Sequence, residues 1–258
     1  MVARDVIPYE VQGSGAGRVI LLHHWFGDRT AFAPMREHLN GEAFSYAFPD
    51  CRGCGEAQQT AGVFTMEEIA ADVLAVADDL DWDTFSVVGH SMGAIAAQLA
   101  LLNAPERVRS LIGVAPMPAS GFPLEGEYRD LFYGAVENPA NRRVIIDTVT
   151  GGQEDDAWLD AMVSRSLERT TPEAFRGYLE SWSTTDFHER VRGNRTPVLV
   201  VTGANDPVLG ADAARGTWLE WYPNAELDVL DGCGHFPTEE TPQALAASLE
   251  QFLSRFAK

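Results

Sequence analysis

Residues 85–93, Phe-Ser-Val-Val-Gly-His-Ser-Met-Gly, are the most informative segment of the chain. Residues 85–88 are typical of a short buried strand, the pattern Gly-x-Ser-x-Gly follows, and a segment with helical spacing begins after it. A tight turn between strand and helix holds the serine in strained geometry, near the positive end of the helix dipole. Flanking glycines leave space for neighbouring chain. The segment predicts a nucleophilic Ser91; the alternative is a glycine-rich turn with a structural role only.

Similar short apolar segments recur on both sides of residues 85–93 and alternate with helical patterns. Alternating strands and helices favour an α/β fold, with a mainly parallel twisted sheet and helices on both faces. An antiparallel edge strand is expected near residues 6–11. The other predicted strands are 19–22, 44–48, 85–88, 111–115, 198–201 and 227–230.

Three helices of this predicted core have recognisable start or stop signals. Thr65 and Glu68 form a capping-box pattern before one apolar helical face. A helix follows Ser91 until Pro105 ends it. Near the C-terminus, Thr241 is a candidate N-cap, with Pro242 at the first helical position.

The region from about residue 118 to 193 interrupts the alternation. It contains no convincing buried strand, but four helical segments near 127–136, 139–149, 155–168 and 172–182. We therefore expect an α/β core made of residues 1–117 and 194–258, with residues 118–193 inserted between two strands as a helical cap or lid. The insertion's aromatic side chains could build either an apolar pocket or the cap's own core: Phe122, Phe132, Tyr133, Trp158, Phe175, Tyr178 and Trp182.

Composition restricts the partners and the location that are expected. The chain has 258 residues and a formal net charge of −19, and an acidic surface repels nucleic acid and anionic membranes. The N-terminus lacks the basic and apolar segments of a secretory signal, and no apolar run approaches the ~18 residues of a membrane span. We predict a cytoplasmic protein with a small-molecule substrate, no nucleic-acid or membrane partner and an unspecified oligomeric state.

The three cysteines give little support for a metal or redox site. Cys51 and Cys54 form a Cys-x-x-Cys pair, but no two further matched ligands lie nearby. Cys233 is expected to fill space beside His235. We predict neither a metal nor a cofactor.

A serine hydroxyl needs a general base to become nucleophilic at neutral pH. Among the six histidines, His38 and His188 are expected at the surface, and His90 should point away from Ser91. His235 lies in a loop after the predicted strand 227–230, where α/β sheets place their sites. We therefore predict His235 as the base.

The third member of a serine triad is an acid that orients the histidine. Asp206 follows the strand 198–201 within Asn205-Asp206-Pro207, which is also a turn-forming sequence. Asp186, Asp228 and Asp231 are alternative candidates. Because the order serine, acid, histidine suits this type of fold, we predict Asp206.

The tetrahedral intermediate of acyl transfer needs hydrogen-bond donors for its oxyanion. The loop after the strand 19–22 can supply the backbone N–H of Trp25, and the residue after the nucleophile supplies that of Met92. For the Trp25 side chain, packing is the favoured role. His24, Phe26 and His90 are the predicted substrate contacts.

Taken together, the segments LLHHWFGD, FPDCRGCGEA, VVGHSMG, VTGANDPV and GCGHFP resemble the α/β-hydrolase superfamily, in its single-domain branch with a helical cap. The resemblance covers nearly all of the chain outside the cap. It implies Ser91 as nucleophile, Asp206 as acid, His235 as base and the amides of Trp25 and Met92 as oxyanion hole. Two departures stand out: His23-His24 replaces the family's usual His-Gly pair, and Arg52-Gly53-Cys54-Gly55 replaces Arg-Gly-His-Gly.

The leading functional hypothesis is a hydrolase that cleaves a carboxylic ester or lactone of a small, largely apolar substrate through an acyl-enzyme. The same residues could instead serve a carbon–carbon bond hydrolase or a peracid-forming enzyme similar to perhydrolases and cofactor-free haloperoxidases. A third alternative is a small-molecule receptor that has kept its triad. Ser91 argues against dehalogenases and epoxide hydrolases of this fold, which use a carboxylate at that position.

Overall fold

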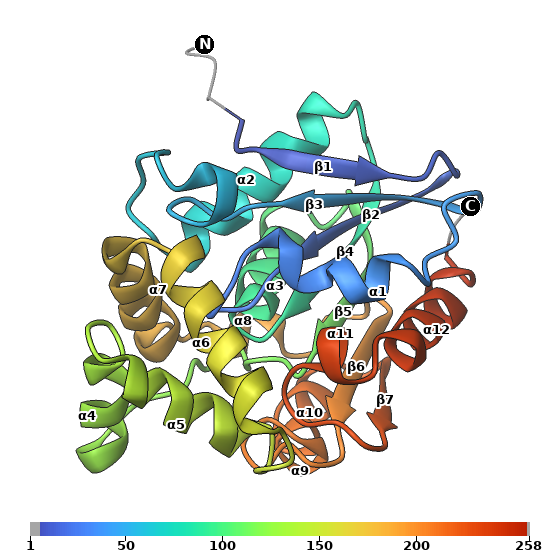
Figure 1. The fold of residues 1–258 in the computed structure, drawn as a ribbon. Helices are drawn as coiled ribbons and strands as arrows, with labels where there is room; N and C mark the ends of the chain where they lie inside the picture. Colours follow the sequence, from blue (N-terminus) through green and yellow to red (C-terminus); the bar gives the residue numbers. More distant parts are fainter. Residues whose placement is uncertain (1–5, 257–258) are drawn as a thin grey trace.

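A seven-stranded sheet lies at the centre of the computed structural model, which describes residues 6–256 (Figure 1). The outer ends of the predicted core, residues 1–5 and 257–258, are outside the described residues. The strand order is β1-β3-β2-β4-β5-β6-β7, with β1 antiparallel to β3 and the remaining pairs parallel. The strands are β1 (Tyr9–Gln12), β2 (Gly17–Leu22), β3 (Phe44–Pro49), β4 (Phe85–His90), β5 (Val108–Val114), β6 (Val198–Gly203) and β7 (Ala225–Leu230).

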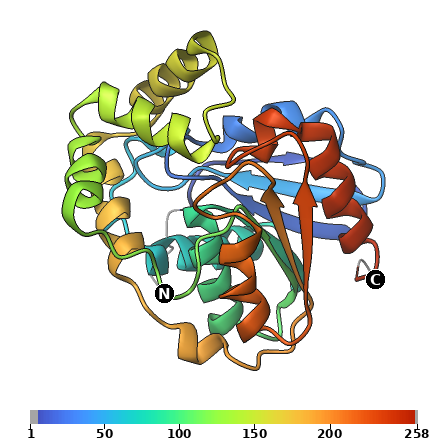
Figure 2. The same cartoon turned by 90° about the horizontal axis from the view of Figure 1, so that it is seen from below.

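Both faces of the sheet are covered by helices. Side chains alternate along each strand, so Ile20 and Leu22 of β2 join the apolar cluster under α2 (Met66–Asp79) and α3 (Met92–Asn103). Val19 and Leu21 join the cluster beneath α1 (Ala33–Arg36) and α12 (Pro242–Leu253). Figure 2 shows these two pairs of helices on opposite sides of the strands. Burial on both faces explains why the strands are continuous apolar runs.

The short helices that remain in the described part of the core follow the strands β2, β3, β6 and β7. They are η1 (Arg29–Phe32), η2 (Gly55–Ala57), α9 (Ala211–Arg215), α10 (Trp218–Trp221) and α11 (Pro237–Glu240).

Five helices lie between β5 and β6, in the region where the sequence predicts four. In Figure 1 the first four gather to one side of the sheet. We call residues 118–193 the cap segment and the rest of the described chain the core. The helices are α4 (Gly126–Gly134), α5 (Pro139–Val149), α6 (Asp156–Arg169), α7 (Pro172–Thr184) and α8 (His188–Val191).

The predicted caps of two core helices differ in detail from the structure. The hydroxyl of Thr65 accepts the backbone N–H of Glu68, as expected, but the Glu68 carboxylate reaches past Thr65 to the N–H groups of Val63 and Phe64. Thr241 is the N-cap residue of α12, as predicted, but its side chain makes no capping hydrogen bond to the helix. Pro242 occupies the first helical position, as expected.

The topology brings four loops to one edge of the sheet. From β2 the chain moves outward to β3, returns to β4 and then adds strands in the opposite direction. In open α/β sheets the carboxyl ends of strands at such a reversal form a crevice. The loops after β2, β4, β6 and β7 contain Trp25, Ser91, Asp206 and His235 respectively.

No helix within residues 6–256 is both long enough and apolar enough to cross a membrane.

Candidate active site

Ser91 occupies a strained turn between β4 and α3. Its backbone angles are φ 53° and ψ −115°, a combination that costs a non-glycine residue free energy and persists only where the surrounding structure enforces it. A Cβ on Gly89 would lie 2.4 Å from the carbonyl oxygen of Gly93, and one on Gly93 would lie 2.8 Å from that of Leu22. Both glycines of the pattern are therefore required by close backbone packing.

The structure brings Ser91, His235 and Asp206 into one hydrogen-bonded chain. His235 Nδ1 lies 2.7 Å from Asp206 Oδ2, and His235 Nε2 lies 2.9 Å from Ser91 Oγ. Because a carboxylate accepts from Nδ1–H, the neutral imidazole leaves Nε2 free to accept the serine proton. The three side chains thus have the geometry of a nucleophile, a general base and its orienting acid.

Asp206 is held in the charged form that this arrangement needs. Burial by itself raises the pKa of its carboxyl group, but the interaction with His235 and the N–H groups of Leu209 and Val208 outweigh burial and lower the pKa below its ordinary value. The N–H groups bind Oδ1, so Oδ2 is left for the imidazole.

The alternative acids are engaged elsewhere. Asp186 is exposed and binds His188, and Asp228 accepts a hydrogen bond from Ser248. Asp231 is exposed, and no contact with His235 is recorded among the described residues.

The loop around His235 is fixed by groups that the sequence analysis did not identify. The backbone N–H of His235 donates to the carbonyl of Val149 in the cap segment, and its carbonyl accepts from His90 Nε2 at 2.7 Å. The carboxylate of Glu240 accepts the N–H groups of Gly234 and Phe236, both at 2.7 Å. The available sequence signal is the Glu239-Glu240 pair of α11, four and five residues past the histidine.

The loop after β2 lies beside the serine turn, and Trp25 lines the same cavity as Ser91. No acceptor for the N–H of Trp25 or of Met92 is recorded in the described chain, so both remain available for an oxyanion. The side chain of Trp25 stacks on Phe175 at 3.9 Å between ring centroids, and its Nε1 donates to the Phe175 carbonyl. Its indole therefore packs against α7 while its amide stays uncommitted.

A small apolar cavity of about 40 Å³ opens beside Ser91 and His235. The core contributes Trp25, Phe26, Met117, Val208 and Leu209 to its lining, and the cap segment contributes Phe122, Phe132, Ile145, Val149 and Trp182. Of the aromatic cap residues considered from sequence, Tyr133, Trp158, Phe175 and Tyr178 do not line it.

Of the three predicted substrate contacts, only Phe26 lines this cavity. His24 is buried and packs edge-on against His90 and Phe236, at 4.8 and 5.0 Å between ring centroids. Burial lowers the pKa of His24 well below its usual value and that of His90 to about 3, so both rings are neutral. These imidazoles connect the loop after β2, the serine turn and the His235 loop, and they do not line the cavity.

The three cysteines are free and buried. Burial raises the pKa of Cys51 and Cys54, and it raises that of Cys233 to about 11. Protonated thiols are poor nucleophiles and poor metal ligands. Residues 6–256 include no group of three or more His, Cys, Asp or Glu side chains placed to hold a metal ion.

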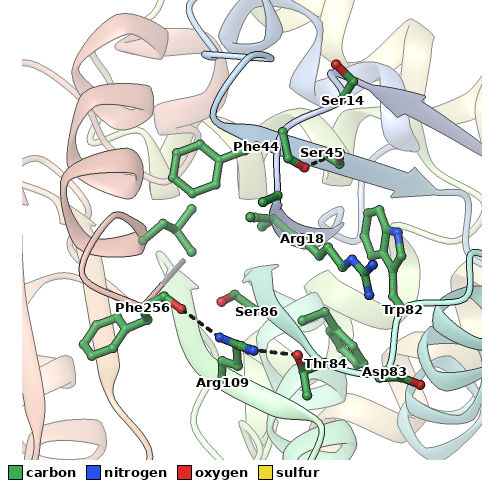
Figure 3. A pocket seen from close by; sticks show the side chains of 16 residues that line it. Ser14, Arg18, Phe44, Ser45, Trp82, Asp83, Thr84, Ser86, Arg109 and Phe256 are labelled. Atoms are coloured by element: carbon green, nitrogen blue, oxygen red, sulfur yellow. Dashed lines mark hydrogen bonds between the residues drawn. The ribbon is translucent and has the colours of Figure 1, made fainter. Parts of the chain in front are cut away.

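A larger cavity, of about 540 Å³, lies at the amino ends of the strands (Figure 3). Arg18 and Arg109 line it, and Arg109 donates to Thr84 Oγ1 and to the Phe256 carbonyl. It contains no paired nucleophile and base, so it has no means of performing the chemistry available beside Ser91.

Comparisons with known proteins agree with this fold. A model of the family described as alpha/beta hydrolase fold matches residues 17–242. The chain is 26% identical to a 2-hydroxy-6-oxononadienedioate/2-hydroxy-6-oxononatrienedioate hydrolase of Cupriavidus pinatubonensis, over 93% of this chain and 88% of that protein. It is 29% identical to a pimeloyl-[acyl-carrier protein] methyl ester esterase of Nitrosomonas europaea, over 97% and 98%.

A solved structure with the same fold is the enol-lactonase from Burkholderia xenovorans. It superposes with a TM-score of 0.84 and 19% identity, covering 96% of each chain.

Proposed function

The chain belongs to the α/β-hydrolase fold family, and from this premise we propose that it is a serine hydrolase that cleaves a carboxylic ester or lactone of a small, largely apolar substrate through an acyl-enzyme. The observation that carries the proposal is the 2.9 Å contact between Ser91 Oγ and His235 Nε2, with Asp206 behind the imidazole. The ester hydrolase and lactonase among the similar proteins also support it.

In the proposed mechanism, Ser91 Oγ attacks the carbonyl carbon while His235 Nε2 takes the hydroxyl proton. Asp206 stabilises the imidazolium that forms, and the amides of Trp25 and Met92 donate to the oxyanion. His235 then protonates the leaving alcohol, which departs and leaves an acyl group on Ser91. A water molecule, deprotonated by His235, attacks this acyl-enzyme and releases the acid.

Replacing Ser91 tests the proposal directly. In Ser91→Ala we expect kcat on short aryl esters to fall by a factor of about 10⁴ or more, because the nucleophile is lost. Unchanged turnover by the purified variant would exclude this mechanism. Circular dichroism of both proteins checks that the substitution leaves the fold intact.

Carbon–carbon bond cleavage is the second candidate, because one similar protein is a hydrolase of a nonadienedioate. Peracid formation uses the same residues, and product analysis separates both from ester hydrolysis. A receptor with a retained triad is distinguished by a fluorophosphonate probe, which should label Ser91 stoichiometrically if the protein is a hydrolase. The cytoplasmic location stays a prediction from the sequence.

A further inference from the structure

The lining of the cavity beside Ser91 indicates which substrates it accepts. His235 is its one ionisable side chain; no Arg, Lys, Asp or Glu of the described chain lines it. Asp206 lies behind the imidazole, with its side chain fully buried. The cavity is therefore electrically neutral apart from the catalytic histidine itself.

An ionised group is expensive to bury in such a cavity. A carboxylate transferred from water to an apolar site without a cation loses its hydration and gains no ion pair. Two arginines of the cap segment are already committed to carboxylates: Arg165 binds Glu239, and Arg169 binds Asp28. Arg142 is buried over the Phe175 ring and donates to Ala135 and Val136 carbonyls and to Ser166.

Trp182 adds one specific polar feature to the lining. Its side chain is fully buried, and its indole Nε1 has no acceptor within the described chain. The other indole in the lining, that of Trp25, already donates to the Phe175 carbonyl. A buried N–H without an acceptor is costly, and because Trp182 lines the cavity, a bound substrate is one source of an acceptor.

From these observations, and building on the proposed hydrolase function, we propose that the substrate is a neutral short-chain ester or lactone without a carboxylate in its acyl part, and that it offers one hydrogen-bond acceptor to the Trp182 indole. This separates the chain from its relative that acts on a dioate. The cavity volume of about 40 Å³ restricts the acyl part to a few carbon atoms unless the cap segment moves.

A matched pair of esters tests the exclusion of charge. 4-Nitrophenyl butyrate and mono-4-nitrophenyl succinate have acyl parts of equal carbon number, but only the second ends in a carboxylate. We expect kcat/KM to favour the butyrate by about 100-fold or more. Adding a cation in Val208→Lys, at the partly exposed edge of the cavity, should reduce that ratio by about 10-fold.

Binding of the intact esters to Ser91→Ala, measured by calorimetry, gives the same comparison without hydrolysis. If Ser91→Ala binds the butyrate ester more tightly than the succinate ester, the exclusion of charged substrates is supported. If the wild type nevertheless hydrolyses neither ester, the hydrolase proposal is contradicted. Equal binding of both esters, or hydrolysis of both at similar rates, would overturn the exclusion of charge.

The acceptor is tested with Trp182→Phe, which keeps an aromatic ring but removes the N–H. 4-Nitrophenyl methoxyacetate places an ether oxygen where the butyrate has a methylene group. The methoxyacetate-to-butyrate ratio of kcat/KM should fall by about 5-fold in the variant, the effect of one neutral hydrogen bond. Trp218→Phe is the matched control, because Trp218 is also buried with a free Nε1 but does not line the cavity. An equal ratio in wild type and Trp182→Phe would overturn the role of the indole.

Discussion

The core and the cap segment meet at one cavity but contribute different chemistry to it. The core provides the hydrogen-bonded groups Ser91, His235 and Asp206, each fixed by strand ends and backbone contacts. The cap segment provides apolar side chains and a single uncommitted N–H, on Trp182. The proposed reaction chemistry therefore depends on the core, whereas the cap segment affects the choice of substrate, together with the core residues of the lining. Substitutions in the two regions should change different kinetic parameters.

The largest effect is expected where the core orients the base. Asp206→Asn replaces the charged acceptor of His235 Nδ1–H by an amide, which favours the wrong imidazole tautomer. We expect kcat on a short aryl ester to fall about 10⁴-fold with little change in KM. Steady-state kinetics of the purified variant measures this.

Asp228→Asn is the matched control for that experiment. Asp228 lies within β7, the edge strand next to β6. Its carboxylate binds Ser248 and not the imidazole. It should retain nearly full activity. Equal losses in the two variants would mean that Asp206 has no special role in orienting His235.

Substitutions of Glu240 and Glu239 separate a contact within the core that positions the His235 loop from a contact with the cap segment. Glu240→Gln replaces one carboxylate oxygen by an NH₂ that cannot accept the N–H of Gly234 or Phe236, so His235 should shift and kcat fall about 10- to 100-fold. Glu239 binds Arg165 of α6 instead. Glu239→Gln loosens only that contact, and a loss of kcat as large as that of Glu240→Gln would refute the distinction.

The core could be predicted from the sequence because its signals are local. Buried parallel strands are short apolar runs, and the serine turn requires glycines that have no substitute at Gly89 and Gly93. The order of Ser91, Asp206 and His235 along the chain then selects among several candidate acids. The sequence predicts that they meet in space because each follows a predicted parallel strand, whose carboxyl ends share an edge, and because the chain resembles the α/β-hydrolases.

The parts that sequence did not reveal depend on packing between distant segments. Nothing local indicates that Phe132 lines the cavity while Phe175 lies behind Trp25. His24 was expected to face the substrate, but its Nδ1 accepts the N–H of Phe26, which turns the ring toward His90. Such orientations are fixed by contacts between loops, and a single sequence does not encode which loops touch.

On the cap side, shortening a wall should widen the range of substrates without affecting the chemistry. Phe132 belongs to α4, of which no residue is fully buried, so Phe132→Ala should be tolerated. We expect kcat/KM for octanoyl esters to rise about 10-fold relative to butyryl esters, while kcat on butyrate stays within about 3-fold. A fall in kcat on both esters, with no change in the chain-length profile, would place Phe132 outside the substrate pocket.

The last comparison concerns stability, and the sign of its pH dependence should differ between the two regions. Burial holds the pKa of His90 in the core at about 3, whereas an unfolded histidine binds a proton near pH 6.5. Between these values the unfolded chain takes up a proton that the native protein does not, so the free energy of unfolding decreases on acidification, by about 1.4 kcal/mol per pH unit from this group. His90→Gln should remove that part of the slope between pH 4 and 6 in urea titrations.

His188 in the cap segment should act in the opposite direction. Its hydrogen bond to Asp186 raises its pKa, so its contribution is fully present below the pKa of an unfolded histidine and is lost as the pH rises through the folded value. Because the His188 side chain is partly exposed to solvent, the contribution is weak. His188→Gln should therefore leave the acid-side slope of wild type intact. If His90→Gln also leaves the acid-side slope of the free energy of unfolding intact, the native protein binds a proton on His90 in this pH range. The buried imidazole that packs against His24 would then be charged.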